Sequence, residues 1–249
     1  MAGDTRPVIY QCKYNRVRDT WHGAMIYNIQ DDYIGTSLDL YGEWGRAEIE
    51  QIIPYATGTV LDIGANIGTH TLSFAKVAHQ VIAIEAQWFN YQSLVANLAL
   101  NAVENVAPLN VAASSADGTM RIAHLHPDQQ INFGAMPVGV GDTFIPSLKI
   151  DSLNLRGVSL IKIDVEGHEE EVLKGATDTI KRERPILYIE ADRDEKRDSL
   201  IACIESLGYS HKWHISPLFN KNNFNDATHN EWPNIYAKNL LCWQMSSAR

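Results

Sequence analysis

From about residue 59 onward, short apolar runs alternate with segments whose apolar residues recur every three or four positions. Such runs predict buried strands, and such spacing predicts helices. The first pair is a strand over 59–63 and a helix over 67–78, and the second is a strand over 81–85 and a helix over about 88–98. This alternation is typical of a parallel sheet whose strands are joined by crossover helices.

Residues 113–150 interrupt the alternation after a third strand that we expect over 105–112. The interrupting segment is rich in glycine and contains an extra strand expected over 119–124, whose pairing the sequence leaves open. We therefore interpret this segment as an insertion into the sheet pattern.

The alternation then resumes up to the end of the chain. The expected elements are a strand over 158–164, a helix carrying Val172, Ala176 and Ile180, a strand over 185–190, a helix closed by Gly208, and a final pair of strands over 209–215 and 240–244. The pattern predicts an α/β fold with helices on both faces of the sheet. Residues 1–55 are expected to form an N-terminal extension that packs on a core of residues 56–249, the whole being a single domain.

Composition narrows the possible partners and location. The chain has 21 basic and 30 acidic side chains and a formal net charge of −9, which argues against bare nucleic acid or an anionic membrane as a partner. Its three cysteines, Cys12, Cys203 and Cys242, form no CxxC pair, so we expect neither disulfides nor a thiolate zinc site. The sequence has no signal-peptide pattern and no apolar run near the roughly 20 residues of a membrane span. We expect a cytoplasmic protein without membrane insertion.

The segment DIGANIG at 62–68 lies where the first strand passes into the first helix. Glycines there allow a sharp turn and a close approach to a ligand, and the helix N-terminus offers free N–H groups. The segment fits neither the dinucleotide fingerprint GxGxxG, since Asn66 and Thr69 stand at glycine positions, nor a phosphate-binding GK[ST] loop. Glu85 ends the second strand, where a carboxylate can accept hydrogen bonds from both hydroxyls of a ribose. A nucleotide-like ligand is predicted.

A second polar cluster, IKIDVEGHE at 161–169, places Asp164, Glu166 and His168 just beyond a central strand. Open α/β sheets bind their ligands at this edge. The structural alternative is that these residues only begin a helix, whose dipole favours carboxylates near its N-terminus. We favour a functional role for the three.

These motifs carry a family resemblance. DIGANIGTHTLSFAK, VIAIEAQ, LALN and above all IKIDVEGHEEEVLKGA resemble the FkbM family of methyltransferases, which methylate hydroxyl groups of sugars, glycans and polyketide natural products. The likeness covers about residues 30–244, and KWHISPLFNKNNF also resembles a motif of bacterial members. It implies the class I methyltransferase fold, Rossmann-like, with seven mostly parallel strands and an antiparallel last strand. The chain departs from the usual pattern at NFGA in the insertion, where Asn-x-Gly-Gly is more common.

The resemblance implies S-adenosylmethionine as the cofactor. The methionine part is expected on the glycine loop, the ribose on Glu85 and the adenine near 112–114. The cofactor-binding residues implied are Asp62, Gly64, Ala65, Asn66, Gly68, Glu85, Ala112, Ala113, Ser114 and Asp164. Tyr33 and Glu43, in the extension, are weaker candidates for covering the cofactor, and Trp44 is left to packing.

Methyl transfer needs an acceptor oxygen in line with the S–CH3 bond and a base to take its proton. His168 is the expected base, because an ordinary histidine is mostly neutral at cytoplasmic pH. Glu166 could orient it or replace it, next to Asp164. Mg2+ binding by Asp164, Glu190 and Asp192 stays open, since oxygen ligands suit this cation but nothing in their spacing requires it.

The acceptor is expected to be a small molecule or glycan. Polar groups beside aromatic rings suit a sugar, and the residues expected to bind it are His214, Asn220, Asn223 and Phe224. The alternative is an asparagine-rich loop that bonds to itself. No role is expected for His70, His79, His124, His126 or His211.

Three other functions stay open: an NAD(P)-dependent oxidoreductase, a non-catalytic module that only binds the cofactor, and an N- or C-methyltransferase. The glycine spacing speaks against the first of these. The oligomeric state cannot be read from the sequence.

Overall fold

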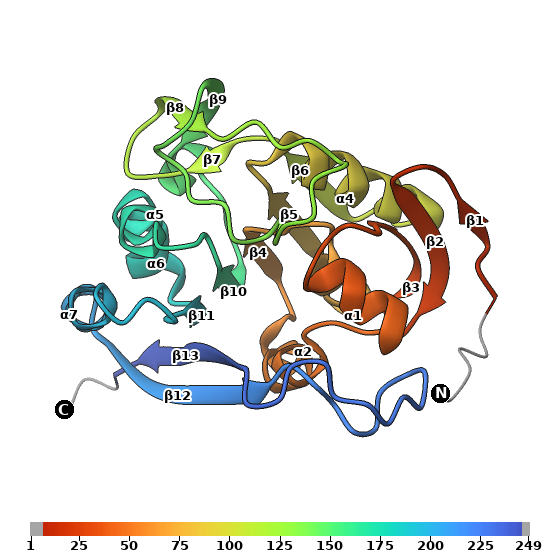
Figure 1. The fold of residues 1–249 in the computed structure, drawn as a ribbon. Coiled ribbons are helices and arrows are strands. Elements are labelled where there is room, and N and C mark those ends of the chain that lie inside the picture. The colour runs from red at the N-terminus through yellow and green to blue at the C-terminus, as the bar shows by residue number, and fades with distance from the viewer. Residues whose placement is uncertain (1–6, 246–249) are drawn as a thin grey trace.

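The computed structural model describes residues 7–245 and is built around a seven-stranded sheet (Figure 1). The strand order is β12 (Tyr209–Pro217), β13 (Tyr236–Gln244), β11 (Ile186–Glu190), β10 (Val158–Ile163), β4 (Thr59–Ile63), β5 (Gln80–Ile84) and β6 (Val106–Leu109). β13 alone runs opposite to the other six strands of this sheet. The predicted α/β fold with an antiparallel last strand is confirmed.

Helices cover both faces of this sheet because successive strand residues point to opposite sides. Leu61, Ile161 and Leu187 belong to the core under α5 (Glu169–Gly175), α6 (Thr177–Glu183) and α7 (Arg197–Ser206). On the other face, Val60 and Leu160 pack with Phe74 of α3 (Thr69–Ala75) and Ile52 of α2 (Arg46–Ile52). The strands are thus buried on both sides, as their β-branched composition predicts.

Two expected elements are each split in the structure. The strand expected over 105–112 ends at Leu109, and Ala112–Ala113 form β7 of a separate three-stranded sheet with β9 (Thr143–Leu148) and β8 (Gly118–Ile122). The break lies at Asn110, whose side-chain amide donates to the carbonyls of Glu85 and Ala86 and turns the chain over the sheet edge. Likewise, the expected helix through Val172 and Ile180 breaks at buried Ala176 into α5 and α6.

The N-terminal extension forms more structure than the sequence indicates. It contains an antiparallel sheet of β1 (Tyr10–Gln11), β2 (Asn15–Thr20) and β3 (Gly23–Asn28), followed by α1 (Ile34–Leu40), α2 and a short 3-10 turn (Ile53–Tyr55). Its Met25, Tyr27 and Leu38 share one apolar cluster with Leu72 of α3 and Leu94 of α4 (Trp88–Leu100). The extension therefore packs directly on the helices next to the glycine loop, although the single-domain division stays a prediction.

The tail loop between β12 and β13 packs against this extension. Trp232 stacks on Tyr33 with ring centroids 5.7 Å apart, and it makes T-shaped ring contacts with Tyr41 and Trp44.

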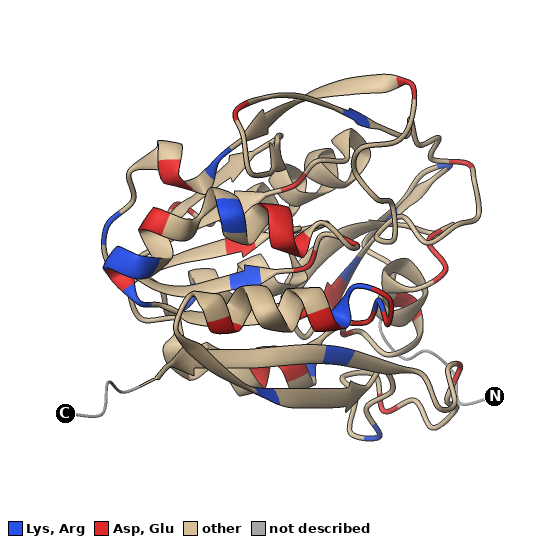
Figure 2. Ribbon diagram, turned by 90° about the vertical axis from the view of Figure 1, so that its left-hand side faces the viewer, with Lys and Arg blue, Asp and Glu red and all other residues tan. Residues whose placement is uncertain are grey.

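On the face shown in Figure 2, acidic and basic residues are interspersed. Within residues 7–245, the helices are too short and too polar to cross a bilayer, and the longest, α4, has 13 residues.

Asn97 of α4 joins three parts of the chain. Its side chain is fully buried, accepts the Ile26 N–H at 2.6 Å, and donates to the carbonyls of Ile26 at 3.1 Å and Ile67 at 2.8 Å. One amide thus ties the edge strand of the extension to the loop that precedes α3.

Replacing Asn97 with alanine should destabilise the protein by about 2–5 kcal/mol, because three buried hydrogen bonds are lost and backbone groups are left unpaired. Urea denaturation followed by circular dichroism measures this loss. Val95→Ala, on the exposed side of the same helix, is the matched control and should change the free energy of unfolding by less than about 0.5 kcal/mol. Equal stability of the two variants would contradict the role given to Asn97.

Candidate active site

The glycine loop between β4 and α3 adopts a backbone that needs its glycines. Gly64, Asn66 and Gly68 all have positive φ, at 78°, 51° and 93°. A Cβ on Gly64 would lie 1.7 Å from the carbonyl oxygen of Asp164, so the two strand ends touch through backbone alone. The N–H groups of Gly64 and Ala65 both donate to the carbonyl of Ile84. The loop is therefore fixed between the carboxyl ends of β5 and β10.

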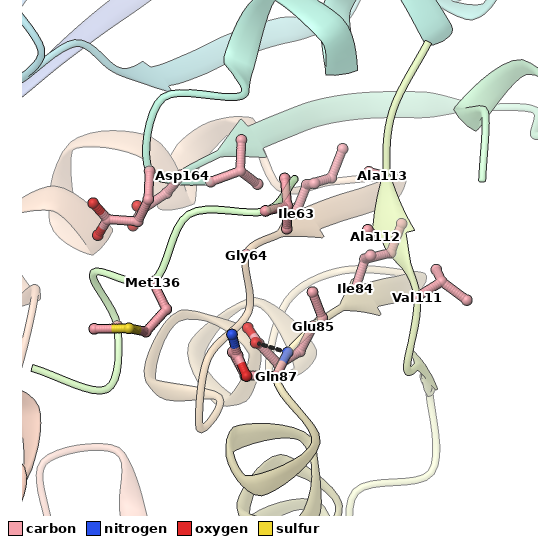
Figure 3. Close-up of a pocket in the computed structure, with 15 residues that line it drawn as sticks. Ile63, Gly64, Ile84, Glu85, Gln87, Val111, Ala112, Ala113, Met136 and Asp164 are labelled. Carbon is pink, nitrogen blue, oxygen red and sulfur yellow. Dashed lines mark hydrogen bonds between the residues drawn. The ribbon is translucent and has the colours of Figure 1, made fainter. Parts of the chain in front are cut away.

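Glu85 holds the loop from the other side. Its carboxylate accepts the N–H of Asn66 at 2.8 Å and the N–H of Gln87 at 2.7 Å, the second of which is drawn in Figure 3. Burial raises the pKa of Glu85 to about 7, although these two hydrogen bonds favour the charged form. A carboxylate that titrates near neutral pH thus lies directly beside the loop.

A small cavity of about 50 Å³ opens next to Glu85 (Figure 3). One wall carries Val111, Ala112 and Ala113, and the insertion closes it with Gly134, Met136 and Val138. Two of the residues expected near the adenine therefore line this cavity. The third, Ser114, lies behind them and contacts His168, with 3.1 Å between Oγ and Nε2.

A larger cavity of about 350 Å³ adjoins the small one, and both are lined by Gly64, Glu85, Gly134, Asp164 and Glu166. The extension supplies one wall of the larger cavity and the strand ends with the tail supply the other. Its remaining lining residues are Tyr33, Ile34, Trp44, Glu48, Ala65, Asn66, Thr69, His70, Asn132, Ala135, Lys162, Glu190, Asp192, Arg193, Leu218, Ile235, Tyr236, Ala237, Lys238 and Asn239.

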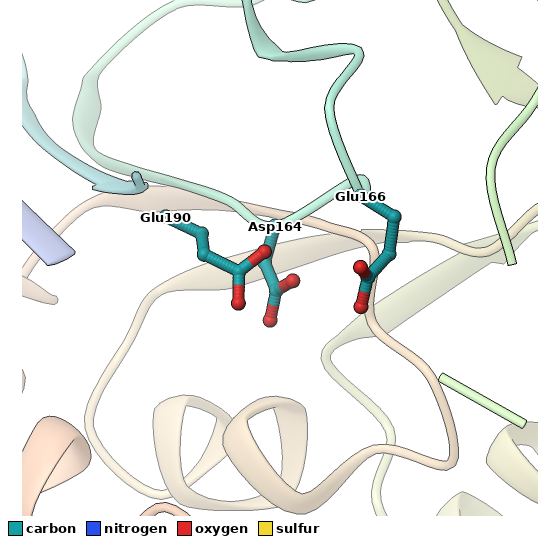
Figure 4. A group of neighbouring side chains, drawn as sticks. All are labelled: Asp164, Glu166 and Glu190. Carbon is teal, nitrogen blue, oxygen red and sulfur yellow. The ribbon is translucent and has the colours of Figure 1, made fainter. Parts of the chain in front are cut away.

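Three carboxylates converge on one wall of this cavity (Figure 4). Asp164, Glu166 and Glu190 each place an oxygen within 4.8 Å of the others. Removal from water opposes ionisation of Asp164, but the ammonium of Lys162, 3.1 Å away, lowers its pKa overall. Burial and the charge of Asp164 raise the pKa of Glu166 to about 8 and that of Glu190 well above its ordinary value. Within this cluster the surroundings therefore favour ionisation of Asp164 over ionisation of the two glutamates.

Glu166 occupies a strained position in this group. Its φ is 56°, in the left-handed region that non-glycine residues rarely adopt. Backbone strain of this kind is concentrated at functional sites. Its side chain forms an ion pair with Arg193, which also faces Asp192 at 3.4 Å. Among the described residues, the metal-capable cluster contains Glu166 and leaves out Asp192, which the sequence-based prediction groups with Asp164 and Glu190.

The structure does not bring His168 to either cavity, since it starts α5 and its ring contacts Ser114. The four residues expected to bind a sugar also lie outside the lining. His214 contacts the hydroxyl of Tyr188, the Asn220 amide and the Phe224 N–H both donate to Glu43, and Asn223 bonds within its own loop. Only the contacts of Asn223 match the alternative of a self-bonded loop, whereas Asn220 and Phe224 tie the loop to Glu43, a candidate for covering the cofactor.

Sequence reasoning misses several residues that line the cavity. It leaves Trp44 to packing and gives His70 no role, yet both line the cavity, as does Glu48. Lys162 carries a usable signal, because a lysine inside an apolar strand is rarely buried without partners. Glu48 carries no such signal in the sequence, because its position in the cavity depends on how the extension packs on the core.

The sheet order and the loop at the end of β4 define the class I methyltransferase fold. Residues 62–211 match the methyltransferase FkbM domain. This chain belongs to the FkbM family of methyltransferases.

Several known proteins are similar to this chain. The hexuronic acid methyltransferase AglP of Haloferax volcanii is 32% identical over 127 residues, which are 48% of this chain and 50% of AglP. The crystal structure of methyltransferase FkbM from Methylobacillus flagellatus has a TM-score of 0.52 at 18% identity, covering 76% of this chain and 44% of that one. Precorrin 8w decarboxylase of Methanobacterium thermoautotrophicum has a TM-score of 0.52 at 13% identity, covering 87% and 97%. The chain thus spans about half the length of the first two, and the structural likenesses show the fold alone.

Replacing Gly64 with alanine should abolish binding of S-adenosylhomocysteine, the product form of the expected cofactor. The new Cβ meets a backbone oxygen at 1.7 Å, so β4 and β10 must separate at their carboxyl ends. Isothermal titration calorimetry measures the binding. Gly157→Ala is the matched control, because Gly157 also has positive φ, a Cβ added there would meet no atom within 4 Å, and it lies at the opposite end of β10. Unchanged binding by the Gly64 variant would contradict this role of the loop.

Proposed function

We propose that this protein is an S-adenosylmethionine-dependent O-methyltransferase whose acceptor is a sugar hydroxyl, in a small molecule or a glycan. The observation that carries the proposal is the pair of adjoining cavities at the carboxyl end of the sheet, which meet at Gly64 and Asp164. The smaller one lies beside Glu85, where the nucleoside part of the cofactor is proposed to enter, and the larger one has room for an acceptor. Family membership supports the methyl transfer.

In this proposal the glycine loop holds the methionine part of the cofactor. Glu85 accepts hydrogen bonds from the ribose, and Ala112 and Ala113 face the adenine, with Ser114 behind them. Asp62 acts indirectly, since it is fully buried and accepts a hydrogen bond from Thr71 at 2.6 Å. Asp164 stands where the cofactor and the acceptor meet.

The lining of the larger cavity supports a sugar as the acceptor. Tyr33 and Trp44 offer aromatic faces, which suit the C–H faces of a pyranose, while Asn132 and Asn239 offer amides for its hydroxyls. Lys238 adds a positive charge that would suit an acidic sugar. The relative AglP is named for hexuronic acid methylation, which points to the same class of acceptor.

The transfer itself is a displacement at the sulfonium methyl group. The acceptor oxygen forms the new bond to carbon, the S–C bond breaks, and S-adenosylhomocysteine leaves. Positioning and exclusion of water supply most of the rate, and a base takes the hydroxyl proton. Glu166 lines the cavity and could serve, whereas His168 would have to act from outside it.

Transfer of a radiolabelled methyl group from S-adenosylmethionine to a panel of sugars tests the proposal. The panel starts with UDP-glucuronic acid and includes UDP-galacturonic acid, neutral nucleotide sugars and a polyketide. Mass spectrometry and NMR of the product identify the methylated atom, which separates O- from N- or C-methylation. Calorimetry comparing NAD with S-adenosylhomocysteine tests the oxidoreductase alternative. Tight binding of NAD, with no transfer to any acceptor, would overturn the proposal.

Binding of S-adenosylhomocysteine should strengthen as the pH rises through about 7. Only ionised Glu85 can accept hydrogen bonds from both ribose hydroxyls, and its pKa is raised to about 7 by burial. Affinity is therefore lost as pH falls through this value, with Kd about tenfold higher at pH 6 than at pH 8. Glu85→Gln is the control for other titrating groups, because its slope should be nearly flat. Parallel pH profiles in the two proteins would show that Glu85 does not face the ribose.

Chelation of divalent cations should leave methyl transfer unchanged. Lys162 is paired with Asp164, and Arg193 with Glu166, so two of the three clustered carboxylates already have cationic partners. Transfer measured with and without EDTA checks this expectation. Loss of activity that Mg2+ restores would instead make Asp164, Glu166 and Glu190 the ligands of a catalytic cation, as oxygen donors of this kind permit.

A further inference from the structure

A buried histidine and a partly buried glutamate face each other in the larger cavity and serve no evident packing purpose. Glu48 of α2 places Oε2 3.6 Å from Nε2 of His70, in the first turn of α3. Their side chains are only 13% and 6% exposed, and both line the cavity. A carboxylate and an imidazole thus meet at the wall of the site where the acceptor is proposed to bind.

One nitrogen of the imidazole is left without a hydrogen bond in the folded protein. Nε2 of His70 is buried without a hydrogen bond, and 3.6 Å is slightly beyond hydrogen-bond range. Within residues 7–245, the contact with His70 is the only ion pair that Glu48 makes. Burying polar groups without partners costs free energy. Because catalytic hydrogen bonds are often long in a ligand-free enzyme and tighten on binding, this pair has the features of a catalytic one.

The surrounding backbone fixes the imidazole. Gly45 has a φ of 65°, and a Cβ there would lie 2.7 Å from Cε1 of His70, so the extension backbone packs against the ring. The ring also lines the same cavity as Asp164. Removal from water opposes ionisation of Asp164, whereas Lys162 and, more weakly, His70 favour it and lower its pKa. His70 is therefore within Coulombic range of the carboxylate beside the glycine loop.

The two residues come from different parts of the chain. His70 lies inside the FkbM domain match over 62–211, and Glu48 lies before it, on the extension. The domain therefore supplies the histidine of the pair, and the extension supplies the glutamate. A carboxylate against one nitrogen of an imidazole fixes the tautomer and leaves the other nitrogen as the proton acceptor.

We propose that His70 is the general base of the methyl transfer and that Glu48 is the positioning residue that orients its imidazole. The inference rests on the proposed function. The acceptor oxygen bonds to the methyl carbon, the S–C bond breaks, and the hydroxyl proton moves to Nδ1 of His70, the nitrogen that does not face Glu48. The products are the methyl ether, neutral S-adenosylhomocysteine and a protonated imidazole, which returns its proton to water.

The test measures transfer to UDP-glucuronic acid, or to whichever member of the panel the wild type methylates best. His70→Ala should lower kcat by about 10²- to 10⁴-fold, with KM and the Kd of S-adenosylhomocysteine changed only a few-fold. Added imidazole should restore part of the rate, which a merely structural role would not allow. His79→Ala, an exposed histidine just after the same helix, is the control and should keep the wild-type rate.

Glu48→Gln should lower kcat by about 10- to 100-fold, and Glu48→Asp should restore part of the loss. The double variant should be no slower than His70→Ala alone, because Glu48 acts through His70. Glu48→Gln, which keeps the size and shape of the side chain, decides the matter if His70→Ala proves too unstable to measure. His168→Ala tests the competing base in parallel.

Three results would overturn the assignment: a His70→Ala rate within about threefold of the wild type, losses in the two variants that multiply in the double variant, or a rate loss confined to His168→Ala. A wild type that binds S-adenosylhomocysteine and methylates a sugar, with unaffected variants, removes this assignment alone. A wild type that transfers to no acceptor removes the proposed function together with it.

Discussion

The geometry of the site depends on one buried lysine. Lys162 lies next to the carboxyl end of the apolar strand β10 and is 3% exposed. Its ammonium lies 3.1 Å from the Gly64 carbonyl, 3.1 Å from Asp164 and 3.6 Å from Asp62. Burial opposes its charge, but the two carboxylates raise its pKa. Removing one partner from such a buried group is costly, of the order of 3–5 kcal/mol, so the glycine loop and Asp164 are held as a unit.

This unit lies between the part of the site that is proposed to bind the cofactor and the part that is proposed to bind the acceptor. The part proposed for the cofactor uses the sheet, the glycine loop and Glu85, which follow from the strand-helix alternation, and is closed by β7 and the insertion. The part proposed for the acceptor is assembled from the extension, the insertion and the tail, which meet around Trp232 and Asn132. Because the extension is anchored by Asn97 to the loop that is proposed to hold the cofactor, the two parts of the site are in a fixed relation.

The contrast between the two parts of the site explains what the sequence could predict. Strands, crossover helices, the glycine loop and Glu85 are local patterns, and a parallel sheet brings the ends of neighbouring strands together. The split at Asn110 was missed because it depends on hydrogen bonds to Glu85 and Ala86 across the sheet edge. The sequence does not predict the position of His70 in the cavity for a similar reason. A histidine in the first turn of a helix shows no functional signal until the fold places Glu48 beside it.

The same reasoning explains why the sequence predicts the tail residues as sugar ligands. Asparagines beside aromatic rings suit a sugar. In the structure, however, the amide of Asn220 donates a hydrogen bond to Glu43, and the amide of Asn223 donates to carbonyl groups of its own loop. The sequence shows which hydrogen-bonding groups are present, but it does not show which partners the fold gives them. Of the predicted chemistry at 161–169, Asp164 and Glu166 reach the cavity because they directly follow the strand end, whereas His168 has turned away into α5.

Charge links the proposed chemistry to turnover. The cavity walls carry ionised Asp164 and the carboxyl groups of Glu85, Glu166 and Glu190, whose pKa values burial raises. A sulfonium cation placed among them favours their ionised forms, so these groups attract the methyl donor more strongly than its neutral product. After transfer the positive charge has left the sulfur, and the carboxyl groups regain their tendency to hold protons. The electrostatic attraction that assembles the reactants is therefore weakened by the reaction itself, which favours exchange of the spent cofactor.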